Sequence, residues 1–141
     1  MGKKKTGGKY IRKRDLMQMV IDLFQQHAGE VFDLKRLFRD LQLKTHPSKM
    51  LCVDCLEDLL ADRREKMPEG SYTTSLFRDG VNRMAQKVGE EAVESVVEAV
   101  DGNRDRFIYE ASDMIYHLLV LMEQMGCSIE DLERELSLRH K

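Results

Sequence analysis

Apolar residues recur at intervals of three and four positions through most of the chain, the spacing of one face of an α-helix. The first helical segment is expected to end near the His27-Ala28-Gly29 break and carries Leu16, Met19, Val20, Leu23 and Phe24. A second begins beside Asp33, the expected N-cap, and carries Leu34, Leu37, Phe38 and Leu41. A third begins at His46-Pro47, because proline fits the first helical turn, and carries Met50, Leu51, Val53, Leu56, Leu59 and Leu60.

Loop signals separate these segments from a second group of helices. Residues 67–71 contain proline and glycine and predict a loop, followed by a short element at about Ser75 to Phe77. Two long helices are predicted at about 81–100 and 104–125, joined by the Asp101-Gly102-Asn103 turn. Gly126 should end the second, and Ser128 with Asp131 resembles a capping box for a last helix to about Leu138. Since no segment alternates as a strand does, the predicted class is all-α.

Length and charge indicate a small, divided molecule. The 141 residues suit one ordinary domain or two very small ones, and exclude a barrel or a doubly wound enzyme. With 42% hydrophobic and 34% charged residues, the chain should fold as a soluble protein. The first fourteen residues carry seven of the 23 Lys and Arg side chains and no acid. We therefore expect a flexible basic tail at 1–12, a helical extension at 13–55 and a further domain at 56–141.

No targeting signal is evident at the start of the chain. The apolar run after the basic residues is interrupted by Gln18 and Asp22 and lacks a small-residue cleavage site. No run approaches the roughly eighteen apolar residues of a membrane-spanning helix. We therefore expect a cytoplasmic protein with no membrane partner and with reduced thiols.

The cysteines allow two interpretations. Cys52 and Cys55 form a lone C-x-x-C with His46 nearby, so a zinc site is conceivable, but no second ligand pair follows. On a helix they are better explained as small apolar fillers, and Cys127 as structural.

Acidic residues form a stripe on each of the two long helices. Residues follow one another at about 100° around a helix, so Glu90, Glu91 and Glu94 fall within about 100° of each other. Arg83 and Lys87 share their face, and an opposite stripe, expected to face the core, carries Val93, Val96, Val97 and Val100. The next helix carries a stripe of Glu110, Asp113 and His117. A tight turn makes such helices antiparallel neighbours, so the acidic stripes can face each other.

Facing carboxylates favour a divalent cation. They repel one another and raise their own pKa values unless a cation lies among them, and oxygen-only clusters suit Mg²⁺. Magnesium keeps open positions for water and phosphates, which suits hydrolysis of a polyphosphate. The alternative is an ordinary solvated acidic face, in which Lys87 and Glu91 form an i,i+4 ion pair.

Several motifs, in order, resemble phosphoribosyl-ATP pyrophosphohydrolase over about Leu56 to His140. They are Ser71-Tyr72-Thr73, the string from Arg83 to Glu94 and the string from Tyr109 to Leu119. The resemblance implies the all-α nucleotide pyrophosphohydrolase fold, a homodimer whose helices complete a bundle between subunits, magnesium dependence and a place in histidine biosynthesis. It also implies that water attacks the α-phosphorus of phosphoribosyl-ATP, releasing pyrophosphate and phosphoribosyl-AMP.

The resemblance also assigns expected roles to individual residues. The E-E-x-x-E and E-x-x-D patterns supply the expected catalytic metal ligands, Glu90, Glu91, Glu94, Glu110 and Asp113. Arg83 and Lys87 are expected to contact phosphate, or else to balance acidic neighbours. Ser71, Tyr72 and Thr73 contact substrate or form the turn, and His117 contacts a ligand or caps the core. Ser75 stands where many relatives have lysine, which removes one expected phosphate contact.

The first 55 residues do not share this resemblance, nor do they carry the metal-binding motifs of the cyclohydrolase domain found in bifunctional relatives. Around Glu30-Val31-Phe32 and the segment 43–47 they are similar to the N-terminal winged-helix segment of bacterial ribonuclease R, without a wing. Such a helix-turn-helix with a lysine-rich lead-in binds nucleic acid through phosphates, or else is a helical appendage with a solubilising tail. Two rival functions therefore remain: a related nucleoside triphosphate pyrophosphohydrolase with another substrate, and a nucleic-acid-binding module that dimerises through its C-terminal half.

Overall fold

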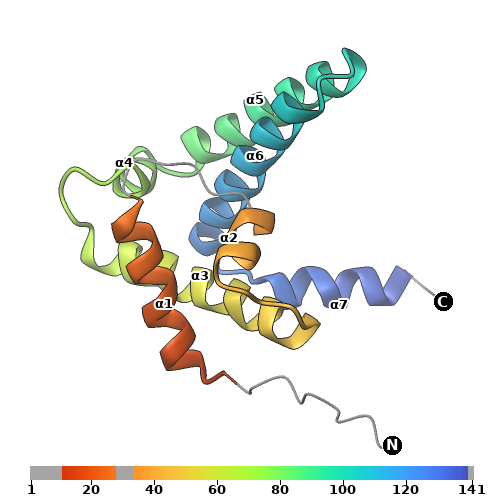
Figure 1. The fold of residues 1–141 in the computed structure, drawn as a ribbon. Coiled ribbons are helices and arrows are strands. Elements are labelled where there is room, and N and C mark those ends of the chain that lie inside the picture. Colours follow the sequence, from red (N-terminus) through yellow and green to blue (C-terminus); the bar gives the residue numbers. More distant parts are fainter. Residues whose placement is uncertain (1–10, 28–33, 140–141) are drawn as a thin grey trace, which may run out of the picture. The chain divides into compact units, whose positions relative to one another are not determined.

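A computed structural model of the chain describes residues 11–27 and 34–139, which form seven α-helices and no strand (Figure 1). The all-α prediction is confirmed. The helices are α1 (Lys13–Gln26), α2 (Leu34–Asp40), α3 (His46–Lys66), α4 (Tyr72–Asp79), α5 (Val81–Val100), α6 (Arg104–Met125) and α7 (Ile129–Arg139). Among the described residues, none of these helices has the length and apolar content needed to cross a membrane. The predicted N-cap Asp33, the break at Ala28-Gly29 and most of the predicted basic tail lie outside the described residues.

The chain divides into two compact units, one ending at Leu56 and the other beginning at Glu57 within α3. Buried side chains of the first unit come from all three of its helices and from the turn before α3: Leu16, Val20, Leu37, Leu41, Leu43, Cys52 and Cys55. The Cys55 thiol donates to the Lys13 carbonyl at 3.8 Å, which joins α3 to α1. Burial raises the pKa of Cys52 to about 12, so this thiol stays protonated. Both cysteines thus agree with the interpretation as apolar fillers.

Capping residues set the helix ends largely where the sequence indicated. Thr45 Oγ1 accepts a hydrogen bond from the Ser48 amide at 3.3 Å and caps α3. Gly126 ends α6 with a φ of 70°, a left-handed conformation that glycine adopts readily. The Ser128 amide donates to Asp131 Oδ2 at 2.8 Å, and the Asp131 amide donates to Ser128 Oγ at 3.4 Å. This reciprocal pair is the predicted capping box, with Asp in the position of Glu.

The start of α4 differs from the prediction. The sequence pattern indicated a short element at about Ser75 to Phe77, whereas the helix begins at Tyr72 and runs to Asp79. Ser71 is its N-cap, because its hydroxyl accepts from the Thr74 amide at 3.4 Å. Tyr72 and Thr73 therefore lie in the first helical turn rather than in a loop.

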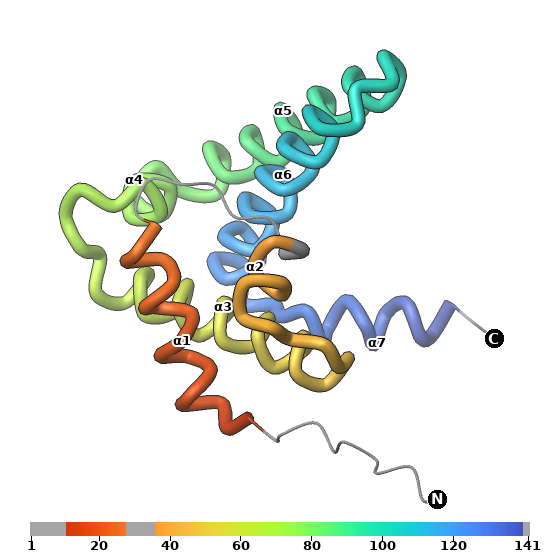
Figure 2. The backbone as a smooth tube through the Cα atoms, in the orientation of Figure 1, coloured from red at the N-terminus to blue at the C-terminus, as the bar shows by residue number. Residues whose placement is uncertain are grey.

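The core of the second unit joins α3, α4, the start of α5 and the end of α6. Its buried cluster consists of Leu60, Leu76, Phe77, Met84, Leu119 and Val120. Polar contacts fix the surrounding ends: an Arg64 guanidinium N–H donates to the Glu123 carbonyl at 2.9 Å, and the Ile129 amide donates to Glu57 at 2.8 Å. Beyond this core, α5 and α6 pack along each other as an antiparallel hairpin (Figure 2).

The valine stripe of α5 does not face a core, and the prediction that it would is wrong. Val93, Val96, Val97 and Val100 are 50–81% exposed, whereas Glu91 and Ser95 on the opposite face are buried. The buried cluster reaches only the first turn of α5, at Met84, and α6 packs on the face that carries the acids. Periodicity identifies two faces of a helix but not which of them meets a neighbour. The described residues therefore leave an apolar stripe exposed on α5.

The buried cluster should dominate the stability of the second unit. Met84→Ala removes a fully buried side chain, so the free energy of unfolding should fall by about 2–5 kcal/mol. Leu138→Ala in α7, at an exposed leucine, is the matched control and should cost less than about 0.5 kcal/mol. Urea denaturation followed by circular dichroism measures both, and equal losses would contradict this description of the core.

Candidate metal centre

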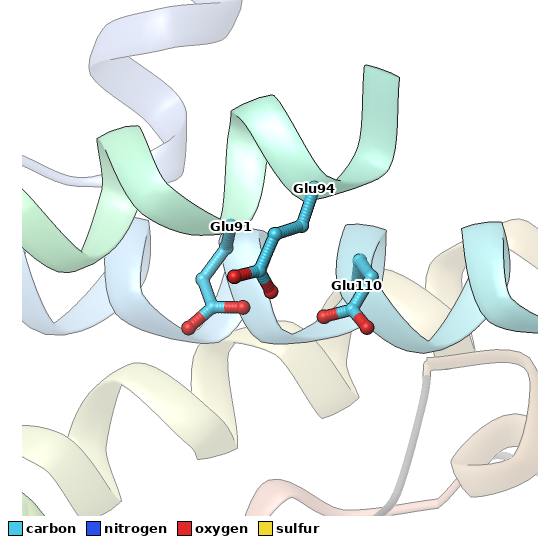
Figure 3. Close-up of side chains that lie close together, drawn as sticks. All are labelled: Glu91, Glu94 and Glu110. Atoms are coloured by element: carbon cyan, nitrogen blue, oxygen red, sulfur yellow. The ribbon is translucent and has the colours of Figure 1, made fainter. Parts of the chain in front are cut away.

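Three carboxylates meet where α5 faces α6. Glu91 and Glu94 lie one turn apart on α5, Glu110 lies on α6, and one oxygen of each lies within 4.8 Å of the others. Figure 3 shows the α5 side chains directed toward α6. The connecting turn makes this possible, since Gly102 adopts a φ of 72° and Asn103 caps α6 by accepting from the Arg106 amide at 3.3 Å. The two predicted acidic stripes therefore do face each other.

Two carboxyl groups at this point, those of Glu110 and the neighbouring Asp113, lie in surroundings that disfavour their charged forms. Glu91 is 5% exposed and Glu110 2% exposed. Burial raises the pKa of Glu110, and the neighbouring Glu94 and Glu91 raise it further, although Arg106 opposes this. Burial also raises the pKa of Asp113, with the charge of Glu91 adding to the effect. A divalent cation among these oxygens would relieve both costs, so the donor set fits a hard metal ion.

Two cations of the chain flank the three carboxylates. Lys87 Nζ lies 2.6 Å from Glu91 Oε1 and 3.0 Å from Glu90 Oε2, and these hydrogen bonds raise the pKa of the lysine. Arg106 forms an ion pair with Glu110 and lies 3.7 Å from Glu98, while its guanidinium sits 5.0 Å from the Tyr109 ring centroid. Each cation contacts a different member of the cluster, so the acids are partly neutralised from both helices.

The five acids expected to bind metal do not all come together. Glu90 turns instead to Lys87, to Gln86 at 2.7 Å and to Arg83 at 3.9 Å. The hydrogen bonds from Lys87 and Gln86 lower the pKa of Glu90, as expected for a carboxylate in an ion pair. Asp113 lies near enough to Glu91 and Glu94 to feel their charge, but it is not one of the three converging carboxylates. The structure thus groups Glu91, Glu94 and Glu110, with Asp113 beside them and Glu90 apart.

His117 links the start of α4 to the acidic cluster. Its Nδ1 lies 2.8 Å from the Asp113 carbonyl, which can only accept, so Nδ1 carries the proton. Nε2 is then the acceptor for the Tyr72 hydroxyl at 3.0 Å. The same Nδ1 lies 4.0 Å from Glu91 Oε1. Burial lowers the pKa of His117, which favours this neutral form.

The other residues of the Ser-Tyr-Thr motif also have defined partners. The Thr73 hydroxyl lies 2.8 Å from that of Tyr116, whose ring stacks with Tyr72 at a centroid distance of 6.4 Å. The Ser71 hydroxyl is occupied by its role as the cap of α4. Thr74 Oγ1 is buried without a hydrogen-bond partner among the described residues. The motif therefore docks α4 against α6 beside Glu91.

Two residues near the cluster were absent from the predicted site. Arg106 contacts Glu110, and Tyr116 contacts Thr73 and lies 5.1 Å from His117 between ring centroids. The i,i+4 spacing of Arg106 and Glu110 is a signal that could have identified the arginine. No comparable signal exists for Tyr116, because its partner lies on another helix.

Carboxylates from both helices of an antiparallel hairpin meet at one point. The fold and this site together define the class: an all-α protein with a candidate divalent-metal site. Residues 53–140 match the family described as phosphoribosyl-ATP pyrophosphohydrolase. The chain therefore belongs to the phosphoribosyl-ATP pyrophosphohydrolase family, which confirms the resemblance of its C-terminal part. The matched segment does not extend to the residues before Val53.

Curated relatives agree with this membership. The chain is 55% identical over 91 residues to a histidine biosynthesis bifunctional protein of Bacteroides thetaiotaomicron, covering 64% of this chain and 45% of the relative. It is 49% identical over 85 residues to a phosphoribosyl-ATP pyrophosphatase of Leptospira biflexa, covering 60% of this chain and 92% of the relative. A phosphoribosyl-ATP pyrophosphatase of Saccharolobus solfataricus is 49% identical over 89 residues, which cover 63% of this chain and 95% of the relative. The match thus spans about half of the bifunctional relative and nearly all of the other two.

The buried neutral His117 predicts a pH dependence of stability. Its folded pKa lies below the unfolded value of about 6.5, so the unfolded chain binds a proton more readily as the pH falls. Any stability that His117 contributes is therefore present above that value and disappears as the pH falls below it. The free energy of unfolding of the wild type relative to His117→Gln should decrease between pH 7.5 and pH 5.

Urea titrations at the two pH values measure this difference. His46→Gln, at an exposed histidine, is the matched control. A difference for His117→Gln that stays constant or grows toward pH 5 would contradict the assignment of a buried neutral imidazole.

Proposed function

We propose that this chain hydrolyses phosphoribosyl-ATP to phosphoribosyl-AMP and pyrophosphate, as a step of histidine biosynthesis. The observation that carries the proposal is the convergence of Glu91, Glu94 and Glu110 between α5 and α6 in a member of this family. The names of the aligned pyrophosphatases support the reaction, because the match spans nearly the whole length of those relatives.

Magnesium is the proposed cofactor, held by Glu91, Glu94 and Glu110, with Asp113 as the nearest further ligand. When bound, the metal neutralises phosphate charge and makes water a better nucleophile. Oxygen-only donors favour this hard cation, and the raised pKa values of Glu110 and Asp113 support a cation at this point. Glu90 was also expected to bind metal, and its contacts with Lys87 and Gln86 favour a role in orienting Lys87 instead.

The chain's own cations are proposed to bind the phosphates of the substrate. Arg83 is exposed and its ion pair with Glu90 is long, at 3.9 Å, so its guanidinium is available to a phosphate. Lys87 contacts Glu91 at one edge of the cluster, where it can hold a phosphate beside the metal. Arg106 acts on Glu110 through their ion pair and is proposed as a positioning residue.

The α4 motif is proposed to shape the neighbouring wall of the site. The Tyr72 hydroxyl and His117 hold each other, and Thr73 is held by Tyr116, so these side chains are preorganised before substrate binds. Exposed Tyr72 is the member best placed to contact substrate. Ser71 uses its hydroxyl as a helix cap, which favours the turn-forming interpretation for this residue.

A second copy of the chain is the proposed partner of the exposed valine stripe. Val93, Val96, Val97 and Val100 form one apolar face on a helix whose opposite face already packs on α6. Two such hairpins can cover each other's stripes as a four-helix bundle, with the carboxylates kept inside each hairpin. The proposal agrees with the homodimer that the family resemblance implies.

Pyrophosphate release from phosphoribosyl-ATP, with Mg²⁺ and then with excess chelator, tests the reaction. Pyrophosphate release that requires the metal is the expected result. A folded sample that releases no pyrophosphate would contradict the proposal. A panel of nucleoside triphosphates tests the rival function, a related pyrophosphohydrolase with another substrate. The panel is needed because the carboxylates recognise the polyphosphate and not the base.

Removing one carboxylate of the cluster should abolish turnover without unfolding the chain. Loss of groups that only support a metal ligand costs about 10–100-fold in metal affinity or activity, so Glu94→Gln and Glu110→Gln should each lower kcat/KM by at least about 100-fold. Asp113→Asn should also be inactive. Glu133→Gln, at an exposed glutamate of α7, is the matched control and should retain full activity. Wild-type turnover in both glutamine variants of the cluster would refute the assignment.

A charge within the valine stripe should separate the dimer. Val96→Asp places a carboxylate in the proposed apolar interface, so sedimentation velocity should show a shift from dimer to monomer. Val81→Asp lies outside the stripe, in the first turn of the same helix, where an acid is well tolerated, and should remain dimeric. A monomeric wild type, or a Val96→Asp variant as dimeric as the wild type, would overturn the proposed assembly.

A further inference from the structure

The two units of the chain carry opposite net charge. Residues 1–56 contain 12 of the 23 Lys and Arg residues but only 6 of the 25 Asp and Glu residues. Residues 57–141 contain the remaining 11 basic and 19 acidic residues. The first unit is therefore basic and the second, which holds the metal centre, is acidic. A basic unit attracts a polyanion that the acidic unit repels.

Two lysines of the first unit form no ion pair with an acid among the described residues. They are Lys44, which is exposed, and Lys49, which is half-buried and lies 5.7 Å from the Phe38 ring centroid. Arg12 and Arg39 of the same unit, by contrast, each pair with a nearby acid. The excess charge of the first unit is thus available to a ligand.

The first unit also presents a helix-turn-helix. A short turn at 41–45 joins α2 to α3, with Leu41 and Leu43 buried and Gln42 at a φ of 55°. The Leu43 amide donates to the Phe38 carbonyl at 2.7 Å, which ties the turn to α2. This anchoring leaves polar side chains exposed in the turn and at the start of α3: Gln42, Lys44, Thr45 and His46. Lys49 follows one turn after His46 on the same face of α3.

We propose that the first unit binds nucleic acid, with the turn at 41–45 and the first turn of α3 against the phosphate backbone. In a helix-turn-helix, residues at the N-terminus of the second helix enter the major groove of a duplex. Lysines there release counterions from the phosphates, which gives affinity without requiring a base sequence. This activity is separate from pyrophosphate hydrolysis, because its residues lie outside the unit that carries the carboxylates.

Fluorescence anisotropy of the full chain with a labelled 20-base-pair DNA duplex, at 50 and 200 mM NaCl, tests the proposal. A matching RNA duplex distinguishes the two sources of phosphate backbone. The wild type should bind at least one duplex at 50 mM and weaken as salt rises. The double variant Lys44→Gln/Lys49→Gln should bind at least about tenfold more weakly, and its salt slope should fall by roughly 0.9 for each phosphate that it no longer neutralises.

The matched control is Arg104→Gln/Arg139→Gln, which removes the same charge from exposed positions of the second unit. It should bind as the wild type does. Circular dichroism checks that all variants are folded. Absence of binding at 50 mM, equal weakening in both double variants, or binding to phosphatidylserine vesicles but to neither duplex would overturn the proposal.

Discussion

The contact between α5 and α6 places like-charged carboxylates at a helix interface. The rest of the second unit depends on how their mutual repulsion and their desolvation are offset. Glu91 and Glu110 are buried where apolar side chains would pack more favourably. Lys87 and Arg106 offset part of the repulsion. Burial still raises the pKa of Glu110 despite Arg106, and the charges of Glu94 and Glu91 add to this effect. A local violation of good packing of this kind is typical of a functional site.

The same constraint connects the site to assembly. Because the acidic face of α5 meets α6, the valine stripe of α5 must face outward. A single hairpin therefore satisfies its charged face and exposes its apolar face, the reverse of an isolated globular helix. In the proposed dimer, burial of the stripes would hold rigid the two helices that carry the carboxylates. Catalysis and association would then rest on one hairpin.

Local signals in the sequence predicted the helices and many of their ends, because caps such as Ser128 with Asp131 and Gly126 act within a few residues. The orientation of α5 could not be predicted that way, since it depends on which face packs against α6. The sequence could not predict, either, which of the neighbouring acids converge between α5 and α6. Glu90 and Glu94 differ little in position around the helix, and Lys87 draws Glu90 away. Tyr116 was missed for a related reason, because its partner Thr73 lies on another helix. The family, in contrast, was evident from motifs alone.

Thermal unfolding of the full chain tests most directly whether the carboxylates between α5 and α6 need a divalent cation. A ligand that binds only the folded state stabilises it by an amount that grows with the logarithm of the ratio of ligand concentration to Kd. Binding therefore raises the unfolding temperature. We predict a rise with MgCl₂ that NaCl of equal ionic strength does not reproduce and that Glu91→Gln removes. Equal unfolding temperatures in MgCl₂ and NaCl would contradict the metal centre.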